Sequence, residues 1–375
     1  MGYSRRSCGW RYQLRMFLVI AVVLNLFIAP LTYISVTKPA PDVKVRNIPK
    51  MSINKSFLVS LHSPPPWLVD LYRRTDPKQC TYNNCQWTID KYLHSISDVI
   101  IFDGPSLDRI PIIRSPGQTW VMLGLESPLH YGSNYKLPAW KSVFNWTMTY
   151  RKDSDIYFPY SEVVKKEDFE DKQNYTRILK SKKYAISWAV SHCNAASDRD
   201  SFVNYLKGYI NDLNTFGKCG NYYCGDWENP DLCFQKMAKE HKFVLSFENS
   251  FCTDYITEKA FIPYTENIVP IVRGGSHYSS FLPVGTYINT NDFSTVKELA
   301  DYVIEIDRHR DQYRELLQRK NQYTILPKTS MYQRAICQVC EKLNTDKHAN
   351  HTYPDIAGWL WKNGGCFYPK DVMPN

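Results

Sequence analysis

The chain has 375 residues, enough for two domains of about 150 residues, each with its own hydrophobic core. Its formal charge of +9 is concentrated at one end, because residues 1–50 hold eight Lys or Arg and a single acidic residue. The remaining residues carry only +2. This distribution excludes a nucleic-acid-binding surface on the bulk of the chain.

An uncharged stretch near the N-terminus predicts a membrane anchor. Residues 16–36, MFLVIAVVLNLFIAPLTYISV, are 21 without a charge, and at about 1.5 Å per residue a helix of this length crosses a hydrocarbon core. A cleaved signal peptide is the competing interpretation, because Asn25 and Pro30 interrupt the span. We expect an uncleaved anchor, with residues 1–15 as a cytosolic tail and the proline-containing residues 37–55 as an extended stem.

Sequons and cysteines indicate the compartment of the remaining chain. Ten of the eleven cysteines follow the anchor, an even number that suits disulfides in an oxidising compartment. N-x-S/T sequons are used only in the secretory lumen. Both features predict a single-pass type II protein whose bulk lies in the lumen. The candidate glycosylation sites are Asn54, Asn145, Asn174 and Asn350.

Residues 56–178 are expected to form a first α/β domain. Three apolar runs in this region, residues 57–61, 97–103 and 119–125, predict strands, and the last two have the composition of buried parallel strands. Glu126 follows the last of them directly, and ligand-facing residues commonly occupy such positions. A solvated loop glutamate is the alternative interpretation.

An acidic triplet, Asp153-Ser154-Asp155, lies in the phrase FNWTMTYRKDSDIYFPY of residues 144–160. In many sugar-nucleotide enzymes a D-x-D pattern holds a divalent cation against a diphosphate. Turns between strands also favour Asp and Ser, because these side chains bond to nearby backbone groups. The triplet alone leaves both interpretations open.

A polar stretch, residues 161–182, marks the crossing to a second domain of residues 179–345. Alternating strands and helices predict a doubly wound parallel sheet there. The predicted strands are residues 184–190, 243–247, 268–272 and 287–293. Arg199 stands at the start of the first helix, where a strand end and a helix start form a typical anion site. Arg177 remains an alternative, and so does a solvated first-turn arginine.

Residues 243–273 predict a β-strand, a helix and a second β-strand in succession. Asp254 is the expected N-cap of a helix that begins near Tyr255. Tyr255, Glu258 and Lys259 then share one face of its first turns, where the helix dipole favours an anion. An ordinary amphipathic helix with a surface ion pair is the alternative.

Three groups of cysteines outside these motifs are expected to form disulfides. Cys337-x-x-Cys340 precedes His348 and His351, a zinc-like arrangement whose histidine gap is shorter than the usual gap of about three to five residues. An oxidising lumen favours disulfides over zinc at this point. Disulfides are also expected among Cys219, Cys224 and Cys233, and a local pair is a candidate for Cys80 and Cys85.

Two stretches of the chain resemble the α1,3-fucosyltransferases of glycosyltransferase family 10. FENS, DYITEK and VPIV, all within residues 243–273, match the donor-binding signature of that family, and residues 144–160 are the second match. The resemblance implies two Rossmann-like domains facing across a cleft (GT-B type), with GDP-fucose on the second and the glycan acceptor on the first. The glutamate before Ser-Pro is the catalytic base of the family, which makes Glu126 the candidate base here.

The resemblance also assigns the other site residues. Arg199 matches a donor-phosphate arginine and is expected, with Lys259, to hold the two phosphates. The positions matched to other donor contacts are Asn249, Tyr255 and Glu258. Glu248 is a secondary candidate that orients the sugar or serves the fold. The resemblance implies no metal site at the D-x-D triplet and no obligate cofactor, with Mn²⁺ or Mg²⁺ only as a stimulant.

The activity implied by the resemblance is an inverting transfer of L-fucose from GDP-β-L-fucose in α1,3 linkage to a GlcNAc residue of a glycan in the Golgi lumen. An N-glycan core, an antenna and the distal chitobiose residue are all compatible acceptors. The alternatives are a catalytically inactive luminal carbohydrate-binding protein of the same fold and a transferase that uses another nucleotide sugar.

The chain departs from the family pattern in two places. Pro263 is expected to end or kink the helix after Lys259 early. Residues from Lys342 onward have no recognisable counterpart, and residues 346–375 are expected to be a C-terminal tail.

Overall fold

The computed structural model describes residues 55–224, 230–345, 351–369 and 371. The predicted cytosolic tail, the anchor and nearly all of the stem lie outside these residues, as do Asn54 and Asn350. Within the described ranges, no helix combines the length and the apolar character needed to span a bilayer.

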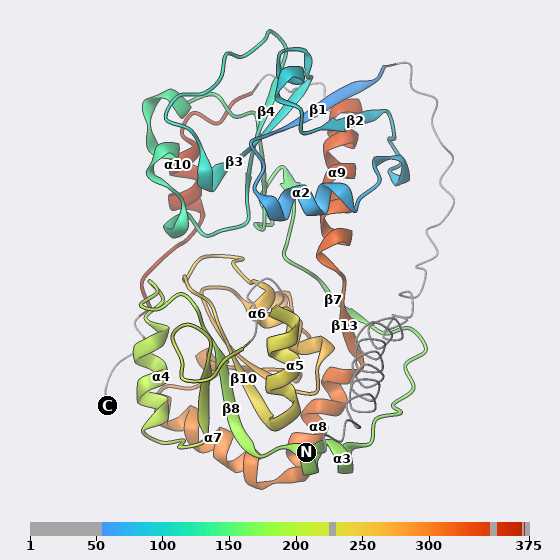
Figure 1. Cartoon of the computed structure of the whole chain (residues 1–375). Helices are drawn as coiled ribbons and strands as arrows, with labels where there is room; N and C mark the ends of the chain where they lie inside the picture. The colour runs from blue at the N-terminus through green and yellow to red at the C-terminus, as the bar shows by residue number, and fades with distance from the viewer. Residues whose placement is uncertain (1–54, 225–229, 346–350, 370, 372–375) are drawn as a thin grey trace, which may run out of the picture. The chain divides into compact units, whose positions relative to one another are not determined.

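The first sheet has six parallel strands in the order β2-β1-β3-β4-β5-β6 (Figure 1). The strands are β1 (Phe57–His62), β2 (Cys85–Thr88), β3 (Val99–Asp103), β4 (Thr119–Gly124), β5 (Trp146–Thr149) and β6 (Ile156–Tyr157). Every residue of β3 and β4 is buried, as expected for a parallel sheet covered on both faces. The three strands predicted in this region are confirmed.

One face of this sheet is covered by α2 (Pro66–Arg73) and by α9 (Lys328–Thr345), a helix from much later in the sequence (Figure 1). Helically spaced apolar side chains of α9 pack with Val59 and Leu61 of β1. These side chains are Met331, Tyr332, Ala335, Ile336, Val339 and Cys340. The predicted second domain, residues 179–345, included α9, whereas the structure packs it on the first sheet. The connections between β1 and β6 contain α2 as their one α-helix, and this leaves part of the sheet face for α9 to cover.

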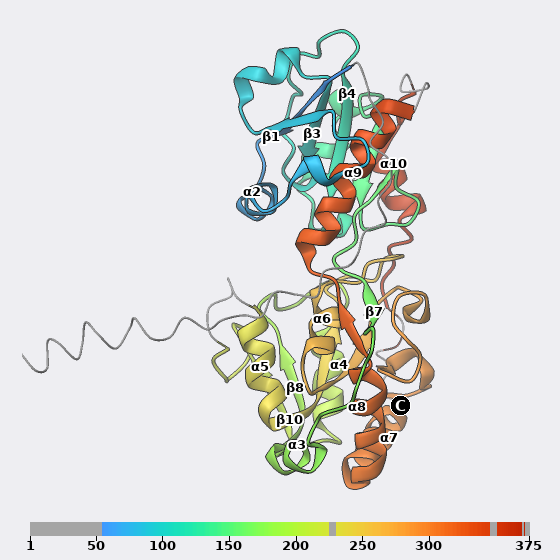
Figure 2. The same ribbon diagram turned by 90° about the vertical axis from the view of Figure 1, so that its right-hand side faces the viewer.

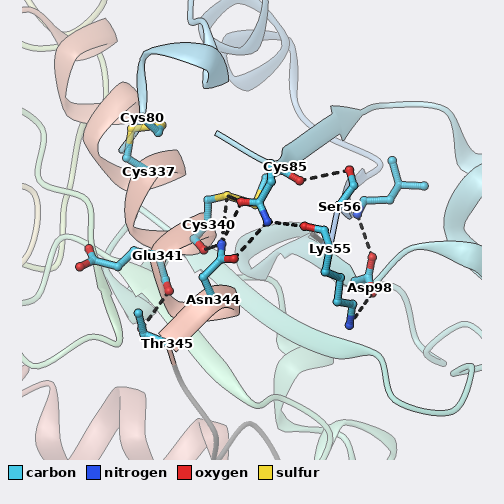
Figure 3. Close-up of a disulfide and its surroundings, with 12 residues drawn as sticks. Lys55, Ser56, Cys80, Cys85, Asp98, Cys337, Cys340, Glu341, Asn344 and Thr345 are labelled. Atoms are coloured by element: carbon cyan, nitrogen blue, oxygen red, sulfur yellow. Dashed lines mark hydrogen bonds and ion pairs between the residues drawn. A yellow bond between two sulfur atoms is a disulfide. The ribbon is translucent and has the colours of Figure 1, made fainter. Parts of the chain in front are cut away.

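Two disulfides fix α9 to the first sheet. Cys80 bonds to Cys337, and Cys85, the first residue of β2, bonds to Cys340 (Figure 3). The local Cys80–Cys85 pair suggested by the sequence is therefore wrong, whereas disulfides in place of zinc at Cys337 and Cys340 are confirmed. The other disulfides are Cys193–Cys219, Cys224–Cys233 and Cys252–Cys366.

The opposite face of the first sheet is covered by residues that the sequence suggested were a tail. α10 (Ile356–Gly358) and the π-helical turn Trp359–Asn363 bury Ile356 and Leu360 against Phe102 of β3 and its neighbours. Alternate residues of β3 and β4 point to the two faces, so both faces need cover. Later residues thus complete the core of the first lobe on both sides.

The second sheet has five parallel strands in the order β12-β11-β10-β8-β9. The strands are β8 (Tyr184–Ala189), β9 (Leu213–Phe216), β10 (His241–Phe247), β11 (Val269–Arg273) and β12 (Ile288–Asn289). The helices are α4 (Arg199–Lys207), α5 (Pro230–Glu240), α6 (Glu258–Phe261), α7 (Val296–Arg308) and α8 (Arg310–Asn321). Because α4, α7 and α8 pack on one face and α5 and α6 on the other, the predicted doubly wound sheet is confirmed.

Both sheets share one strand order. Numbered from the first strand of each lobe, it runs 2-1-3-4-5, and the first sheet adds a sixth strand at the end. The direction of winding reverses between β1 and β3 and between β8 and β10. Ligands of open α/β sheets bind outside the carboxyl ends of the strands at such a reversal. The topology therefore points to the loops after β1, β3, β8 and β10.

The chain crosses between the sheets along two strands that pair with each other. β7 (Val163–Lys165) leads out of the first lobe, and β13 (Tyr323–Ile325) leads back toward α9 as its antiparallel neighbour (Figure 2). The predicted crossing, residues 161–182, contains β7 and α3 (Tyr175–Ser181). The sequence predicted the segment that leads from the first lobe to the second, but not β13, which leads back to the first.

The two described sequons differ in accessibility. Asn174 is exposed and caps α3 by accepting from the backbone N–H of Arg177 at 3.0 Å, which leaves its amide nitrogen available for a glycan. Asn145 is only 3% exposed, and its amide donates to the carbonyl of His351 at 2.9 Å. The structure contradicts glycosylation of Asn145, because a glycan on a buried, hydrogen-bonded amide has no room.

Candidate active site

The candidate base, Glu126, faces residues of the second lobe. It follows β4 by two positions, and its Oε2 accepts a hydrogen bond from the Tyr255 hydroxyl at 3.1 Å. A cavity of about 350 Å³ is lined by Glu126 together with Asn249, Glu258 and Lys259. The structure thus brings the predicted base and the predicted donor-binding motif into one cavity.

The loop from β10 to α6, residues 248–257, is built differently from the helix that the sequence predicted. Asp254 has a φ of +60° and accepts from the backbone N–H of Lys152 at 3.1 Å instead of capping a helix. The helix α6 begins only at Glu258 and lasts four residues. Tyr255 therefore lies outside it, and the cluster with Glu258 and Lys259 arises from the loop fold rather than from helical spacing.

The early end of α6 matches the expectation from Pro263. After Phe261 the chain tightens into a 3₁₀ turn over Ile262–Thr265, in which Pro263 takes an early position. A proline at this point lacks the N–H that an α-helix needs. Because α6 is so short, the charges at this place come from side chains and not from a helix dipole.

Glu248 holds the residue before α6 in place through hydrogen bonds. It is fully buried, and its carboxylate accepts from both the backbone N–H and the hydroxyl of Thr257, each at 2.8 Å. The same carboxylate lies 3.6 Å from Lys259 Nζ. Burial raises the pKa of Glu248, while the Lys259 charge opposes that rise. Of the two roles left open for Glu248, these contacts fit support of the loop.

Lys259 is a cation held at the edge of the cavity. Its ammonium donates to Glu258 Oε1 at 2.9 Å and to Thr257 Oγ1 at 2.8 Å. Burial disfavours its charge, but Glu258 and Glu248 outweigh that cost and raise the pKa of Lys259. Likewise, burial works to raise the pKa of Glu258, and the Lys259 charge lowers it on balance. The pair is ionised at neutral pH.

Arg199, the first residue of α4, supplies a second cation. Its guanidinium is 2% exposed and donates to the carbonyls of Phe247 at 2.8 Å and His192 at 2.9 Å. Burial lowers the pKa of Arg199, but a guanidinium begins so far above neutrality that it stays charged. Arg177, the alternative, is exposed on α3 and lines neither of the two cavities.

A larger cavity of about 920 Å³ adjoins the first one. Arg199 lines it, and both cavities share Asn249, Glu258 and Lys259. Its apolar wall includes Ala189, Val190, Phe234, Leu245, Phe261 and Ile262. A nucleotide sugar suits such a space, because the wall can cover a flat base while the cations meet a diphosphate.

Lys328 lines both cavities and was missed by the sequence analysis. It is the first residue of α9, and its ammonium lies 4.7 Å from the ring centre of Trp67 and 5.5 Å from that of Tyr160. Burial lowers the pKa of Lys328. Nothing in its local sequence signals this position, because it follows from the packing of α9 against the first sheet.

The acidic triplet stabilises the first lobe. Asp153 binds the buried Arg151, accepting from its Nε at 2.8 Å. Asp155 accepts from the backbone N–H of Thr147 at 2.9 Å and from the Tyr353 hydroxyl at 2.8 Å. Across the described residues, no group of three or more His, Cys, Asp or Glu side chains is arranged to hold a metal ion.

Two family models match the chain. "Fucosyltransferase, N-terminal" matches residues 55–161, and "Glycosyltransferase family 10 (fucosyltransferase) C-term" matches residues 179–359. The second match extends beyond Lys342, where the sequence analysis had found no counterpart.

Curated relatives carry the same family name. Glycoprotein 3-alpha-L-fucosyltransferase A of Drosophila melanogaster is 33% identical over 314 residues, which cover 80% of this chain and 59% of that protein. Alpha-(1,3)-fucosyltransferase C of the same species is 30% identical, with 71% and 65% covered. The 3-galactosyl-N-acetylglucosaminide 4-alpha-L-fucosyltransferase of Bos taurus is 30% identical, with 74% of each chain covered. The chain thus spans less than two thirds of the length of the two Drosophila proteins.

A solved structure shares the fold. The crystal structure of an alpha1,3-fucosyltransferase with GDP-fucose superposes with a TM-score of 0.55 at 16% identity, over 82% of this chain and 96% of that one. Taken together, the two sheets, the motif positions and these matches show that the chain belongs to the fucosyltransferases of glycosyltransferase family 10.

Proposed function

We propose that the chain transfers L-fucose from GDP-β-L-fucose, with inversion, to a GlcNAc residue of an N-glycan core or antenna in α1,3 linkage. Family membership supports the reaction class, and the structural neighbour bound to GDP-fucose supports the donor. The size and lining of the larger cavity are compatible with a nucleotide sugar.

One observation carries the proposal: a carboxylate and two fixed cations border adjoining cavities, each group on a different segment of the chain. Glu126 follows β4 by two positions, Arg199 begins α4, and Lys259 lies in α6. Inverting transfer needs a base on the acceptor and positive charge at the leaving group, at separate ends of one site. The two sheets present these groups from opposite sides.

The proposed step is a single displacement. Glu126 takes the proton of the acceptor hydroxyl as its oxygen bonds to the anomeric carbon of fucose. The bond from that carbon to the diphosphate oxygen breaks, and its electron pair leaves with GDP. Arg199 and Lys259 stabilise the charge that develops there. A carboxylate base of this kind contributes about 10²- to 10⁴-fold to the rate.

We further propose a Golgi protein that is anchored by residues 16–36 and has its catalytic lobes in the lumen. Five disulfides among the described residues support an oxidising compartment. The exposed sequon at Asn174 supports the same placement.

The test compares Glu126→Gln with the unaltered full-length chain in detergent, given GDP-fucose and a panel of defined N-glycans. Glutamine keeps the shape of the side chain but cannot accept a proton, so turnover should fall by about 10²- to 10⁴-fold while GDP affinity stays within about twofold. Mass spectrometry locates the added fucose. Glu305→Gln, on the exposed surface of α7, is the matched control and should keep full activity.

Two outcomes would contradict the proposal. Full turnover by Glu126→Gln would remove Glu126 from the role of base. If the unaltered chain binds glycans but transfers no fucose to any member of the panel, the protein is instead a luminal carbohydrate-binding protein of the same fold.

A further inference from the structure

Residues 364–369 and 371, here called the strap, run alongside the loop 248–257 that carries Asn249 and Tyr255. A disulfide between Cys252 and Cys366 joins the two segments covalently. The strap therefore contacts the donor-side loop directly, although it lies more than a hundred residues later in the sequence, at a separation of 114 for the two cysteines.

Backbone hydrogen bonds extend this contact. Thr253 N–H donates to the carbonyl of Gly364 at 3.1 Å, and Phe367 N–H donates to the carbonyl of Phe251 at 2.8 Å. Phe251 and Phe367 form an antiparallel bridge, with their ring centres 5.6 Å apart. Backbone pairing fixes a loop more tightly than side-chain packing alone, because it sets the position of the main chain.

The strap also provides the counter-charge for a buried arginine. Arg273, the last residue of β11, is 1% exposed. Its guanidinium forms a bidentate ion pair with the Asp371 carboxylate and donates from Nε at 2.8 Å and from Nη2 at 2.7 Å. Among the described residues, Asp371 is the acidic side chain that forms an ion pair with it. A buried guanidinium needs such a partner, since an unpaired charge there is strongly unfavourable.

From Arg273 the contacts continue to the candidate donor-binding residues. Its Nη1 donates to the carbonyl of Ser197 at 2.8 Å, and Ser197 N–H donates to the carbonyl of Asn249 at 3.1 Å. Ser197 precedes Arg199 by two residues, and both Asn249 and Arg199 line the larger cavity. A single buried guanidinium thus connects the strap to the loop that presents Arg199.

We propose that Asp371 is a positioning residue for the donor nucleotide. By pairing with Arg273 it holds the Ser197 carbonyl in place, and so sets the position of Arg199 and Asn249 against the diphosphate. The inference rests on the proposed function, since it takes the larger cavity as the GDP site. It also gives a role to residues that the sequence analysis treated as a tail.

The test uses Asp371→Asn and Asp371→Glu in the full chain, with GDP as the probe in calorimetry. Asparagine removes the charge and one of the two acceptors, so the Kd for GDP and the KM for GDP-fucose should rise about tenfold while the acceptor KM stays within about twofold. Glutamate restores the carboxylate and should recover most of the loss. Asp355→Asn, an exposed residue of the same C-terminal region, is the control and should bind GDP normally.

Hydrogen exchange separates this inference from the proposed function. Exchange at residues 193–199 should speed up in Asp371→Asn while exchange in α9 stays unchanged, whether or not the chain binds GDP. If the Asp371→Asn protein cannot be expressed in folded form, Arg273→Lys takes its place. Lysine keeps the positive charge but cannot form the bidentate pair, so it should show the same pattern of hydrogen exchange. Unchanged hydrogen exchange at residues 193–199 would overturn the inference. An equal loss of affinity for donor and acceptor, with faster hydrogen exchange throughout the described chain, would overturn it as well.

Discussion

Tyr255 acts on the candidate base in this structure, although the family resemblance matched it to a donor contact. Its side chain is 1% exposed, and its hydroxyl donates to Glu126 at 3.1 Å. The ring of Tyr150 packs against it with centres 5.1 Å apart. Its hydroxyl proton is therefore directed to Glu126, whose carboxylate it holds toward the cavity.

Replacing Tyr255 with Phe keeps the ring and removes the hydroxyl that donates to Glu126. A bond to a charged group contributes about 1.5 to 3 kcal/mol, so kcat should fall about 10- to 100-fold while the Kd for GDP stays unchanged. Steady-state kinetics and calorimetry measure the two quantities. Tyr368→Phe, on a 73% exposed side chain, is the control. A large loss of GDP affinity in Tyr255→Phe would restore the donor-contact role.

At the level of single residues, the sequence predicted the members of the site better than their geometry. Arg199 and Lys259 lie where a strand end meets a helix start, as the pattern indicated. The prediction that Tyr255, Glu258 and Lys259 share a helical face was wrong. The positive φ of Asp254 and the disulfide of Cys252 give this loop a different shape. Neither constraint is visible in local spacing.

At the scale of elements, β10 begins with a histidine that must stay neutral. His241 is 2% exposed; its Nδ1 lies 3.1 Å from the carbonyl of Met237, and its Nε2 lies 3.0 Å from the amide nitrogen of Asn214. A carbonyl accepts and an amide nitrogen donates, so the proton belongs on Nδ1 and Nε2 accepts. Burial lowers the pKa of His241, although the Met237 carbonyl opposes that effect.

This depressed pKa predicts a pH dependence of stability. Unfolded, His241 has a pKa of about 6.5, so below that pH the unfolded chain binds a proton that the folded chain does not. The contribution of neutral His241 to the free energy of unfolding is therefore fully present above about pH 6.5. It is lost as the pH falls toward the pKa that His241 has in the folded chain. His241→Gln should make the slope of unfolding free energy against pH shallower by up to about 1.4 kcal/mol per unit.

Denaturant unfolding at several pH values measures that slope. His309→Gln, on an exposed histidine between α7 and α8, should leave the slope as it is in the unaltered chain. An unchanged slope in His241→Gln would show that His241 does not couple folding to proton uptake.

Among the elements, the strands were the most predictable and α9 the least. Apolar runs gave β1, β3, β4, β8, β10 and β11, because parallel strands buried on both faces read as continuous hydrophobic segments. The apolar stripe of α9 predicts a buried helix face but not the sheet that it covers. That partner is decided by which sheet face remains open, a property of the assembled fold.

At the scale of the whole molecule, disulfides of very different span make a comparative prediction. Cys80–Cys337 closes a separation of 257 residues, whereas Cys224–Cys233 closes only 9. A longer loop loses more unfolded-state entropy when it is closed. Because Cys85–Cys340 closes nearly the same loop, both long-range disulfides must be removed together. The Cys80→Ala/Cys85→Ala/Cys337→Ala/Cys340→Ala chain should lose about 2 to 4 kcal/mol, or roughly 5 to 10 °C in Tm, and Cys224→Ala/Cys233→Ala should lose less. Calorimetry under non-reducing conditions makes the comparison, and an equal or reversed order would contradict it.

The placement of α9 and of residues 351–369 sets the order in which the protein can be completed during synthesis. The ribosome releases β1 to β6 and α2 early, but α9 and α10, which complete the cover of the two sheet faces, are translated only after the entire second lobe. Until then Cys80 and Cys85 cannot form the disulfides that the folded chain has, because Cys337 and Cys340 have not been made. The two lobes therefore cannot fold to completion in the order in which they are synthesised. The first lobe is made first but is completed last.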